Sequence, residues 1–230
     1  TSVYDGLLLS AQHRATKGLT LSANYTLSRC ISDLVNYEPA QAGIPLTKPG
    51  DKAYDRGSCG VSDRRHIANV STVYQVPALS KGVVGAITRD WQVSGIVRAQ
   101  TGNFYSVTTG ADNALSGTPN QRPNLIANPY LKNGYQWLNP AAFAAPAPGT
   151  YGDLKANSLV GPGTFNVDMG LSRSFKAGKE REFQFRAEIF NLLNNTQLQN
   201  PVTALTASNF GFITAAYDPR IIQLAVKFGF

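Results

Sequence analysis

The last eleven residues of the chain, RIIQLAVKFGF (Arg220–Phe230), alternate between apolar and polar side chains with a period of two. One side carries Ile222, Leu224, Val226, Phe228 and Phe230, and the other carries Gln223, Ala225, Lys227 and Gly229. This pattern predicts a β-strand with one apolar and one polar face that ends on an aromatic ring.

The same alternation recurs along the whole chain. It predicts seven strands, at residues 4–14, 19–30, 65–76, 91–106, 165–175, 181–192 and 220–230. In nearly every strand the alternate positions form a polar face, and this face carries charged residues. We expect the following polar side chains to face a watery lumen: Gln92, Arg98, Asp168, Gln184, Arg186, Glu188, Gln223 and Lys227.

The connections between these segments differ in length in a regular order. Short ones lie at TKG (16–18), at the linker 77–90 and at KAGKE (176–180), and they alternate with long ones, rich in Gly, Pro and Asn, at 31–64, 107–164 and 193–219. This order predicts an antiparallel meander with short turns at one end and elaborate loops at the other. Long loops inside a compact domain are usually functional.

Two architectures fit a period of two: a soluble β-sandwich and a membrane barrel. Outer-membrane barrels have short periplasmic turns, long extracellular loops and aromatic girdles at both interfaces. Aromatic residues gather beside the short turns, at Tyr74, Trp91, Phe175, Phe183, Phe185, Phe228 and Phe230. We therefore favour an all-β meander of about seven transmembrane strands, and the sandwich remains the alternative.

Composition excludes several other classes of protein. The chain has 230 residues, of which 43% are hydrophobic and 15% charged, and no apolar run approaches the about 18 residues that a transmembrane helix needs. The net charge of +7 comes from scattered Lys and Arg without a nucleic-acid motif, so we expect no nucleic-acid partner. The N-terminus lacks the pattern of a signal peptide.

Few residues suggest a chemical site. Cys30 and Cys59 flank the first long loop, and we expect them to form a disulfide in an oxidising exterior. Asp51, Asp55 and Asp63 share this loop without the spacing of a calcium loop, so we expect them to be solvated. His13 and His66 are not accompanied by a nucleophile. We expect no enzymatic activity and no cofactor.

Four segments carry a family resemblance: SCGVSDRRHIANVSTVYQVP (58–77), SLVGPGTFNVDMGLSRSF (158–175), FQFRAEIFNLLNNTQLQNP (183–201) and SNFGFITAAYDPRIIQLAVKFGF (208–230). RPNLIANP (122–129) and WLNPAAFAAPAPGTYGDL (137–154) are similar too. Together they resemble the C-terminal part of Oar-like TonB-dependent receptors. The resemblance covers essentially the whole chain.

What the resemblance implies is a bacterial outer-membrane receptor or transporter for a bulky substrate. Its barrel would have about 22 strands and a plug domain. The partners would be the lipid bilayer, the remainder of the barrel and plug, the TonB complex and the barrel-assembly machinery, which reads a terminal aromatic strand. No plug occurs within residues 1–230, so we expect this chain to be the C-terminal segment, because seven strands alone would leave two unpaired edges in lipid. The alternative is an extracellular binding or adhesion protein whose contact surface is the loop 107–164.

The terminal aromatic residue gives a test. Deleting Phe230, or replacing it with Asp, in the full-length protein should impair assembly more than it impairs the stability of folded barrels. One ring contributes only about 1.5 to 3 kcal/mol of burial, whereas assembly must recognise the strand before other contacts exist. Surface-exposed protein and heat-modifiable folded barrel would be measured for each variant. Normal surface levels would mean that the terminal ring has no role in assembly.

Overall fold

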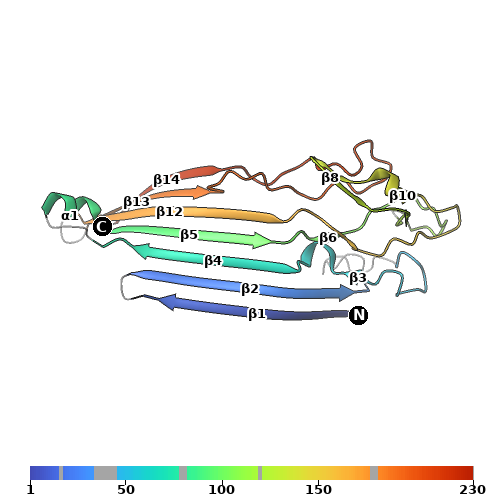
Figure 1. Cartoon of the computed structure of the whole chain (residues 1–230), viewed down its shortest axis with the longest axis horizontal. Helices are drawn as coiled ribbons and strands as arrows, with labels where there is room; N and C mark the ends of the chain where they lie inside the picture. The colour runs from blue at the N-terminus through green and yellow to red at the C-terminus, as the bar shows by residue number, and fades with distance from the viewer. Residues whose placement is uncertain (16–17, 34–45, 78–81, 119–120, 177–180, 230) are drawn as a thin grey trace.

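The chain folds into an antiparallel β-sheet with long loops at one end. The structure is a computed structural model, which describes residues 1–15, 18–33, 46–77, 82–118, 121–176 and 181–229. Within these residues seven long strands run side by side along the longest dimension of the molecule (Figure 1). They are β1 (Ser2–Arg14), β2 (Leu19–Ser32), β4 (His66–Gln75), β5 (Trp91–Gln100), β12 (Thr164–Lys176), β13 (Glu182–Phe190) and β14 (Ile221–Gly229). They pair in the order β1-β2-β4-β5-β12-β13-β14, which confirms the predicted meander.

The structure differs from the prediction at one strand end and in one connection. The fourth long strand, β5, ends at Gln100 and not at residue 106, because the chain leaves the sheet at Gly102. A β-carbon at Gly102 would lie 1.9 Å from the carbonyl oxygen of Gly161, so only glycine fits there. The linker 77–90 also contains a helix that we did not predict, α1 (Gly82–Thr88). Among the described residues, no helix has the length and apolar character needed to cross a membrane.

One face of the sheet is largely apolar. Residues that are partners across a ladder share a face, and Val97 of β5 is the partner of Val70 on β4 and of Val167 on β12. At the end of the sheet, Leu224 and Val226 of β14 share this face and are 67% and 71% exposed. Large apolar side chains that stay exposed on a regular strand are expected where lipid, and not a second sheet, covers them.

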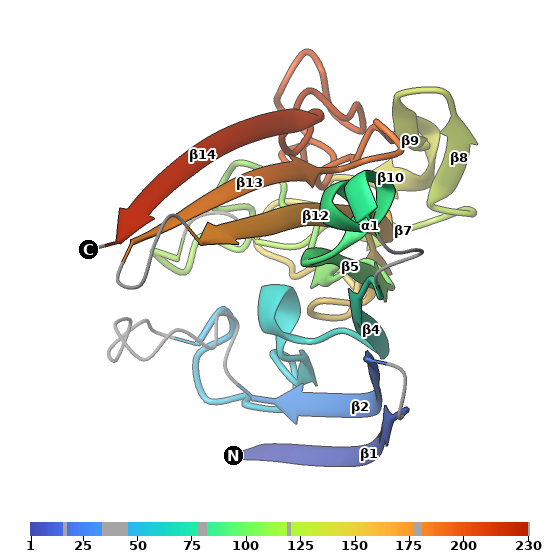
Figure 2. The ribbon, with the colours of Figure 1, turned by 90° about the vertical axis from the view of Figure 1, so that its left-hand side faces the viewer.

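The sheet bends into an open arc when it is seen along its strands, with β1 and β14 at the two ends (Figure 2). In the described part of the chain, β1 is hydrogen-bonded only to β2, and β14 only to β13. Each of these two strands therefore has one edge whose backbone groups lack a ladder partner.

The long connections fold together at one end of the sheet (Figure 1). Their short elements are β3 (Gly57–Ser58), η2 (Gly60–Ser62), β6 (Phe104–Tyr105), β7 (Asn124–Leu125), β8 (Tyr130–Asn133), β9 (Gln136–Leu138), η3 (Pro140–Ala142), β10 (Phe143–Ala144) and β11 (Leu159–Val160). We call the assembly of described residues 46–65, 101–163 and 191–220 the loop cap.

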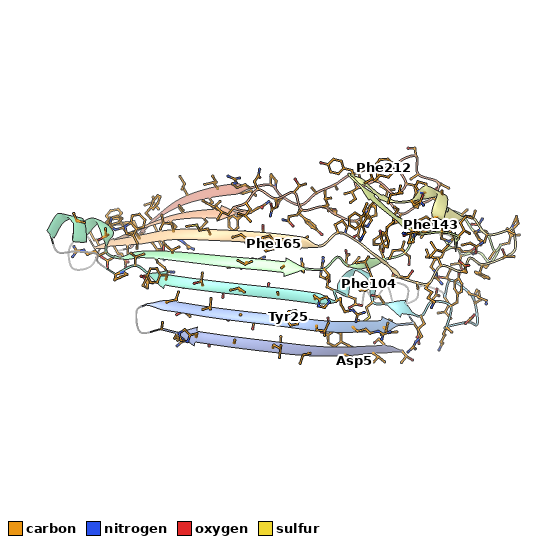
Figure 3. The ribbon with its side chains drawn as sticks, viewed as in Figure 1. Asp5, Tyr25, Phe104, Phe143, Phe165 and Phe212 are labelled. Carbon is orange, nitrogen blue, oxygen red and sulfur yellow. A yellow bond between two sulfur atoms is a disulfide. The ribbon has the colours of Figure 1, made fainter. Side chains whose placement is uncertain are left out.

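The buried apolar core of the described residues lies in the loop cap. Its members are Tyr105, Val107, Leu138, Ala142, Phe143, Leu154, Leu159 and Phe210. The rings of Phe143 and Phe210 meet edge to face, with centroids 5.5 Å apart, and Figure 3 labels Phe143 at the loop end of the molecule. A soluble sandwich would instead bury its core between two sheets. The position of this core therefore argues against the sandwich.

Aromatic rings gather at the opposite end of the apolar face, beside the short turns. Phe183 and Phe228 are ladder partners whose ring centroids lie 4.7 Å apart. The guanidinium of Arg173 lies 4.3 Å from the ring centroid of Phe175 and 5.3 Å from that of Trp91. Rings with a polar or cationic neighbour are typical of the boundary between hydrocarbon and headgroups.

The two faces can be tested at one depth on β4. Val70 and Ser71 are neighbours in mid-strand whose side chains lie on the apolar and the polar face respectively. Val70→Arg should cost about 2 to 4 kcal/mol of folding free energy in a bilayer, because it places a charge in hydrocarbon. Ser71→Arg should be mild. Equilibrium folding into lipid vesicles would measure both, and equal losses would contradict the assignment of the faces.

Candidate functional site: the polar face and its loop cap

The eight polar residues predicted to face the lumen share one face of the sheet. They are Gln92, Arg98, Asp168, Gln184, Arg186, Glu188, Gln223 and Lys227. Ladder pairs connect them from strand to strand: Gln92 is the partner of Ser172, Ser172 of Arg186, and Glu188 of Gln223. A few apolar residues, including Ile96, lie on this face as well. The face is therefore polar across the four strands β5, β12, β13 and β14.

Asp168 is the most strongly held acidic group of this face. Its Oδ1 accepts hydrogen bonds from the Nδ2 of Asn166 (2.7 Å) and from the backbone N–H of Asn191 (2.9 Å). Its Oδ2 lies 3.5 Å from the Nη2 of Arg98. The side chain of Asp168 is 12% exposed, whereas that of Arg98 is 57% exposed. Asp168 is thus fixed by its neighbours, and Arg98 still presents donors to solvent.

A pocket of about 440 Å³ lies beside this pair, where the polar face meets the loop cap. It is lined by Arg98, Gln100, Thr164, Asn166, Asp168, Phe190, Asn191, Gln197, Tyr217, Asp218, Pro219 and Ile221. The lining offers hydrogen-bond donors, acceptors and charges of both signs. It can hold a polar solute, and its residues do not include the paired nucleophile and base of a hydrolase.

Asn191 closes one wall of this pocket. It follows β13 with a positive φ of 51°, a conformation that asparagine tolerates better than most residues. Its Nδ2 donates to the carbonyl oxygens of Asn195 (2.9 Å) and Asp218 (3.4 Å). The 4% exposed Asn191 therefore ties the end of β13 to the segment that carries Asp218.

The side chain of Gln197 makes the hydrogen bonds to β12 that β13 no longer makes after Phe190. Because β13 stops at Phe190, the first residues of β12 lose their ladder partner on that side. The Oε1 of Gln197 accepts from the backbone N–H of Phe165 (2.9 Å), and its Nε2 donates to the carbonyl oxygen of the same residue. One side-chain amide thus satisfies both backbone groups of Phe165.

The remaining predicted residues lie away from this pocket. Gln92 and Gln184 line a separate hollow of about 670 Å³ near the short turns, where the Nε2 of Gln75 donates to the Oε1 of Gln92 (2.7 Å). The Nη2 of Arg186 lies 2.6 Å from the Oε1 of Glu188 on the same strand. Gln223 and Lys227 are exposed on β14. The structure therefore brings only Arg98 and Asp168 of the eight into the loop-end pocket.

Several pocket residues that we did not predict come from the segment that follows β13. The polar ones among them are Asn191, Gln197, Tyr217 and Asp218, and the strands add Gln100, Thr164, Asn166 and Phe190. The segment NLLNN (191–195) carries a signal for a turn, since asparagine favours turns, but nothing in it indicates a contact with Asp168.

A disulfide fixes the first loop to the sheet. Cys30 on β2 is bonded to Cys59, with Cα atoms 5.4 Å apart, and the backbone N–H of Cys59 donates to the carbonyl oxygen of Cys30 (3.3 Å). Next to the bridge, Ser58 of β3 is the ladder partner of Ile31 on β2. Residues 57–58 therefore extend the sheet beyond the loop end of β4.

The first loop in turn contacts the second. The Nδ2 of Asn157 donates to the carbonyl oxygen of Ser58 (2.8 Å), and the Oδ1 of Asn157 accepts from the Oγ of Ser106 (3.1 Å). A β-carbon at Gly57 would lie 1.9 Å from the carbonyl oxygen of Ala156. This close approach makes residues 46–65 and 101–163 one packed unit.

The prediction that the acidic residues of the first loop are solvated was wrong for Asp55 and Asp63, which are 0% and 2% exposed. The Oδ1 of Asp55 lies 2.8 Å from the Nη1 of Arg122, whose guanidinium also stacks 4.0 Å from the ring centroid of Tyr54. The third residue, Asp51, is partly exposed and pairs with Lys48 at 2.9 Å. In the described ranges, no three potential metal-ligating residues gather at one place.

The buried Asp55–Arg122 pair is fully hydrogen-bonded. Asp55 Oδ2 accepts from the backbone N–H of Thr47 (2.7 Å), and Arg122 donates through Nε to Leu154 O (2.9 Å) and through Nη2 to Tyr54 O (2.6 Å). Removing either partner of such a buried ion pair is strongly destabilising, because it leaves an uncompensated buried charge. The pair joins the first and second loops at a further point, in addition to the contacts of Asn157.

Neither histidine belongs to the pocket. The Nδ1 of His66 lies 2.7 Å from the hydroxyl oxygen of Tyr25, on the apolar face at its loop end. His13 is exposed on β1.

Deep in the loop cap, burial raises the pKa of the Tyr105 hydroxyl well above its ordinary value, so this group stays protonated.

Comparison with known proteins gives one match. The family model described as "outer membrane beta barrel domain" matches residues 1–223, which is nearly the whole chain. The search of curated proteins and the search of solved structures found no match.

The disulfide leads to a prediction about the loop cap. Reducing the bridge, or replacing both Cys30 and Cys59 with Ala, should destabilise the cap by about 3 to 4 kcal/mol on the chain-entropy argument for a loop of this length. The sheet should be little affected. Limited proteolysis would report the cap, and heat-modifiable mobility would report the barrel. Peptide mass spectrometry without reductant should find Cys30 joined to Cys59, and two free thiols would contradict the pairing.

Proposed function

Because the chain belongs to the outer membrane beta barrel domain family, and its place is the bacterial outer membrane, we propose that its sheet is the C-terminal part of the wall of a TonB-dependent receptor. The receptor takes up or passes a bulky substrate. It is a transporter and not an enzyme.

The observation that carries this proposal is the pair of contrasting faces on a sheet with two open edges. The apolar face suits lipid, and the polar face, with its charged residues on β5, β12 and β13, suits a wet lumen. In lipid the free edges of β1 and β14 need partners, because each unpaired backbone group costs several kcal/mol. A barrel of about 22 strands supplies both partners and leaves room for a plug.

The loop-end pocket adds a place where a substrate first meets the wall. Arg98, Asp168, Tyr217 and Asp218 offer charged and hydrogen-bonding groups at the mouth of the lumen. A plug and the TonB complex would then control passage along the polar face. This assignment of partners rests on the resemblance of residues 58–77, 158–175, 183–201 and 208–230 to Oar-like receptors.

The terminal strand fits recognition by the barrel-assembly machinery. Ile222, Leu224, Val226 and Phe228 lie on the apolar face of β14 and are exposed along its free edge. Phe230, the last residue of the proposed signal, lies outside the described residues.

A second candidate function is extracellular binding or adhesion. The observation that favours it is the loop cap, which has its own buried cluster and so presents a fixed surface to the exterior. In this case the barrel is only an anchor, and nothing passes along the polar face.

Thiol labelling in cells separates the two functions. Ser71→Cys in the full-length protein places a thiol on the polar face in mid-strand, and Val70→Cys places one at the same depth on the apolar face. A water-soluble, membrane-impermeant maleimide should label Ser71→Cys several-fold faster when the TonB complex is energised, because displacement of the plug opens the lumen. Val70→Cys should stay unlabelled.

The control is a strain without TonB, or cells treated with an uncoupler. Equal labelling of Ser71→Cys with and without energisation would reject TonB-dependent transport and favour the adhesion function. Labelling of Val70→Cys would contradict the placement of the apolar face in lipid.

A further inference from the structure

A second hollow lies on the apolar face of the sheet, at its loop end. It has a volume of about 770 Å³, and its floor includes Ala68 of β4, Ala99 of β5 and Phe165 of β12. Figure 3 labels Phe165 on β12 close to the loops. These floor residues belong to the same face as Val70 and Val97, so the hollow continues into the surface that contacts lipid.

The wall of the hollow is the hairpin of β8 and β9, which contributes Tyr130, Lys132 and Trp137. Both aromatic side chains are fixed by backbone groups of Val160: the Nε1 of Trp137 donates to its carbonyl oxygen (3.2 Å), and the hydroxyl of Tyr130 accepts from its N–H (2.7 Å). The two rings meet edge to face with centroids 6.4 Å apart. The wall is therefore a preformed aromatic surface.

Lys132 brings a positive charge to this wall. Its ammonium lies 5.0 Å from the ring centroid of Tyr130 and 5.3 Å from that of Trp137. The ion pairs found among the described residues do not include Lys132. No described carboxylate is within ion-pair distance of its ammonium, and Lys132 lines the same hollow as the apolar floor residues.

The depth of the hollow determines what can occupy it. The loop end of an outer-membrane barrel faces the exterior, so the hollow lies where the hydrocarbon of the outer leaflet meets the headgroups. Aromatic rings and lysine are favoured at this boundary. An occupant must present apolar chains to Ala68, Ala99 and Phe165 and an anionic group to Lys132.

We propose that the groove between the β8–β9 hairpin and the loop end of the apolar face binds a lipid with a phosphate-bearing, net anionic headgroup. The phosphate lies against Lys132 and the rim of Tyr130 and Trp137, and the acyl chains lie on the floor and continue down the apolar face. A single exposed cation would hold free phosphate only weakly in water, where its attraction is screened. The apolar floor is what favours a lipid.

Photocrosslinking tests the proposal on the full-length protein in mild detergent. The probe is a phosphatidylglycerol with a diazirine near its headgroup, and peptide mapping measures labelling of residues 130–138. We expect labelling of this segment, several-fold lower in Lys132→Glu and retained in Lys132→Arg. Lys155→Glu, an exposed lysine elsewhere in the loop cap, is the matched control and should label like the unaltered protein.

Three results would overturn the proposal. The first is equal labelling of residues 130–138 by a phosphatidylcholine probe with the same acyl chains, which would remove the role of net charge. The second is unchanged labelling in Lys132→Glu. The third is competition by inorganic phosphate, which would indicate a site for free anions. Heat-modifiable mobility of each variant shows that it is folded, and Lys132→Ala replaces Lys132→Glu if the latter fails this check.

Discussion

A backbone amide or carbonyl in a bilayer needs a hydrogen-bond partner within the protein, because hydrocarbon offers none. This constraint explains the long ladders, in which β1 and β2 pair without interruption from Ser2–Ser32 to Arg14–Thr20. It also explains Gln197, whose side-chain amide pairs with Phe165 where β13 has ended. The same constraint makes the free edges of β1 and β14 incompatible with a sheet that stands alone in lipid.

In this protein the buried apolar core lies in the loops, whereas in a soluble β-protein it lies against the sheet. Leu224 and Val226 are largely exposed on the sheet, whereas Val107 and Leu138 of the loop cap are completely buried. Lipid covers the apolar face of the sheet, so the strands need no second layer. The loop cap lies in water and must supply its own packing, which it does with an apolar cluster, the Asp55–Arg122 pair and the Cys30–Cys59 bridge.

The long strands could be predicted from sequence because each is governed by a local pattern. A strand with lipid on one side and water on the other has apolar and polar residues in alternation. The same alternation predicted that Arg98 and Asp168 lie on one face. The loop cap could not be predicted, since its contacts join distant residues. Asp55 looks like a solvated loop residue until Arg122, 67 positions away, is placed beside it. The end of β5 depends likewise on the approach of Gly161 to Gly102.

The separate core of the loop cap has a consequence for which of its surface residues can be substituted. The cap has exposed side chains that belong neither to its buried cluster nor to the ladders of the sheet. An example is Leu115, which is 77% exposed. Substitutions at such positions change the outer surface of the cap and leave the ladders and the buried cluster untouched. The architecture thus permits the surface of the cap to change without a new barrel.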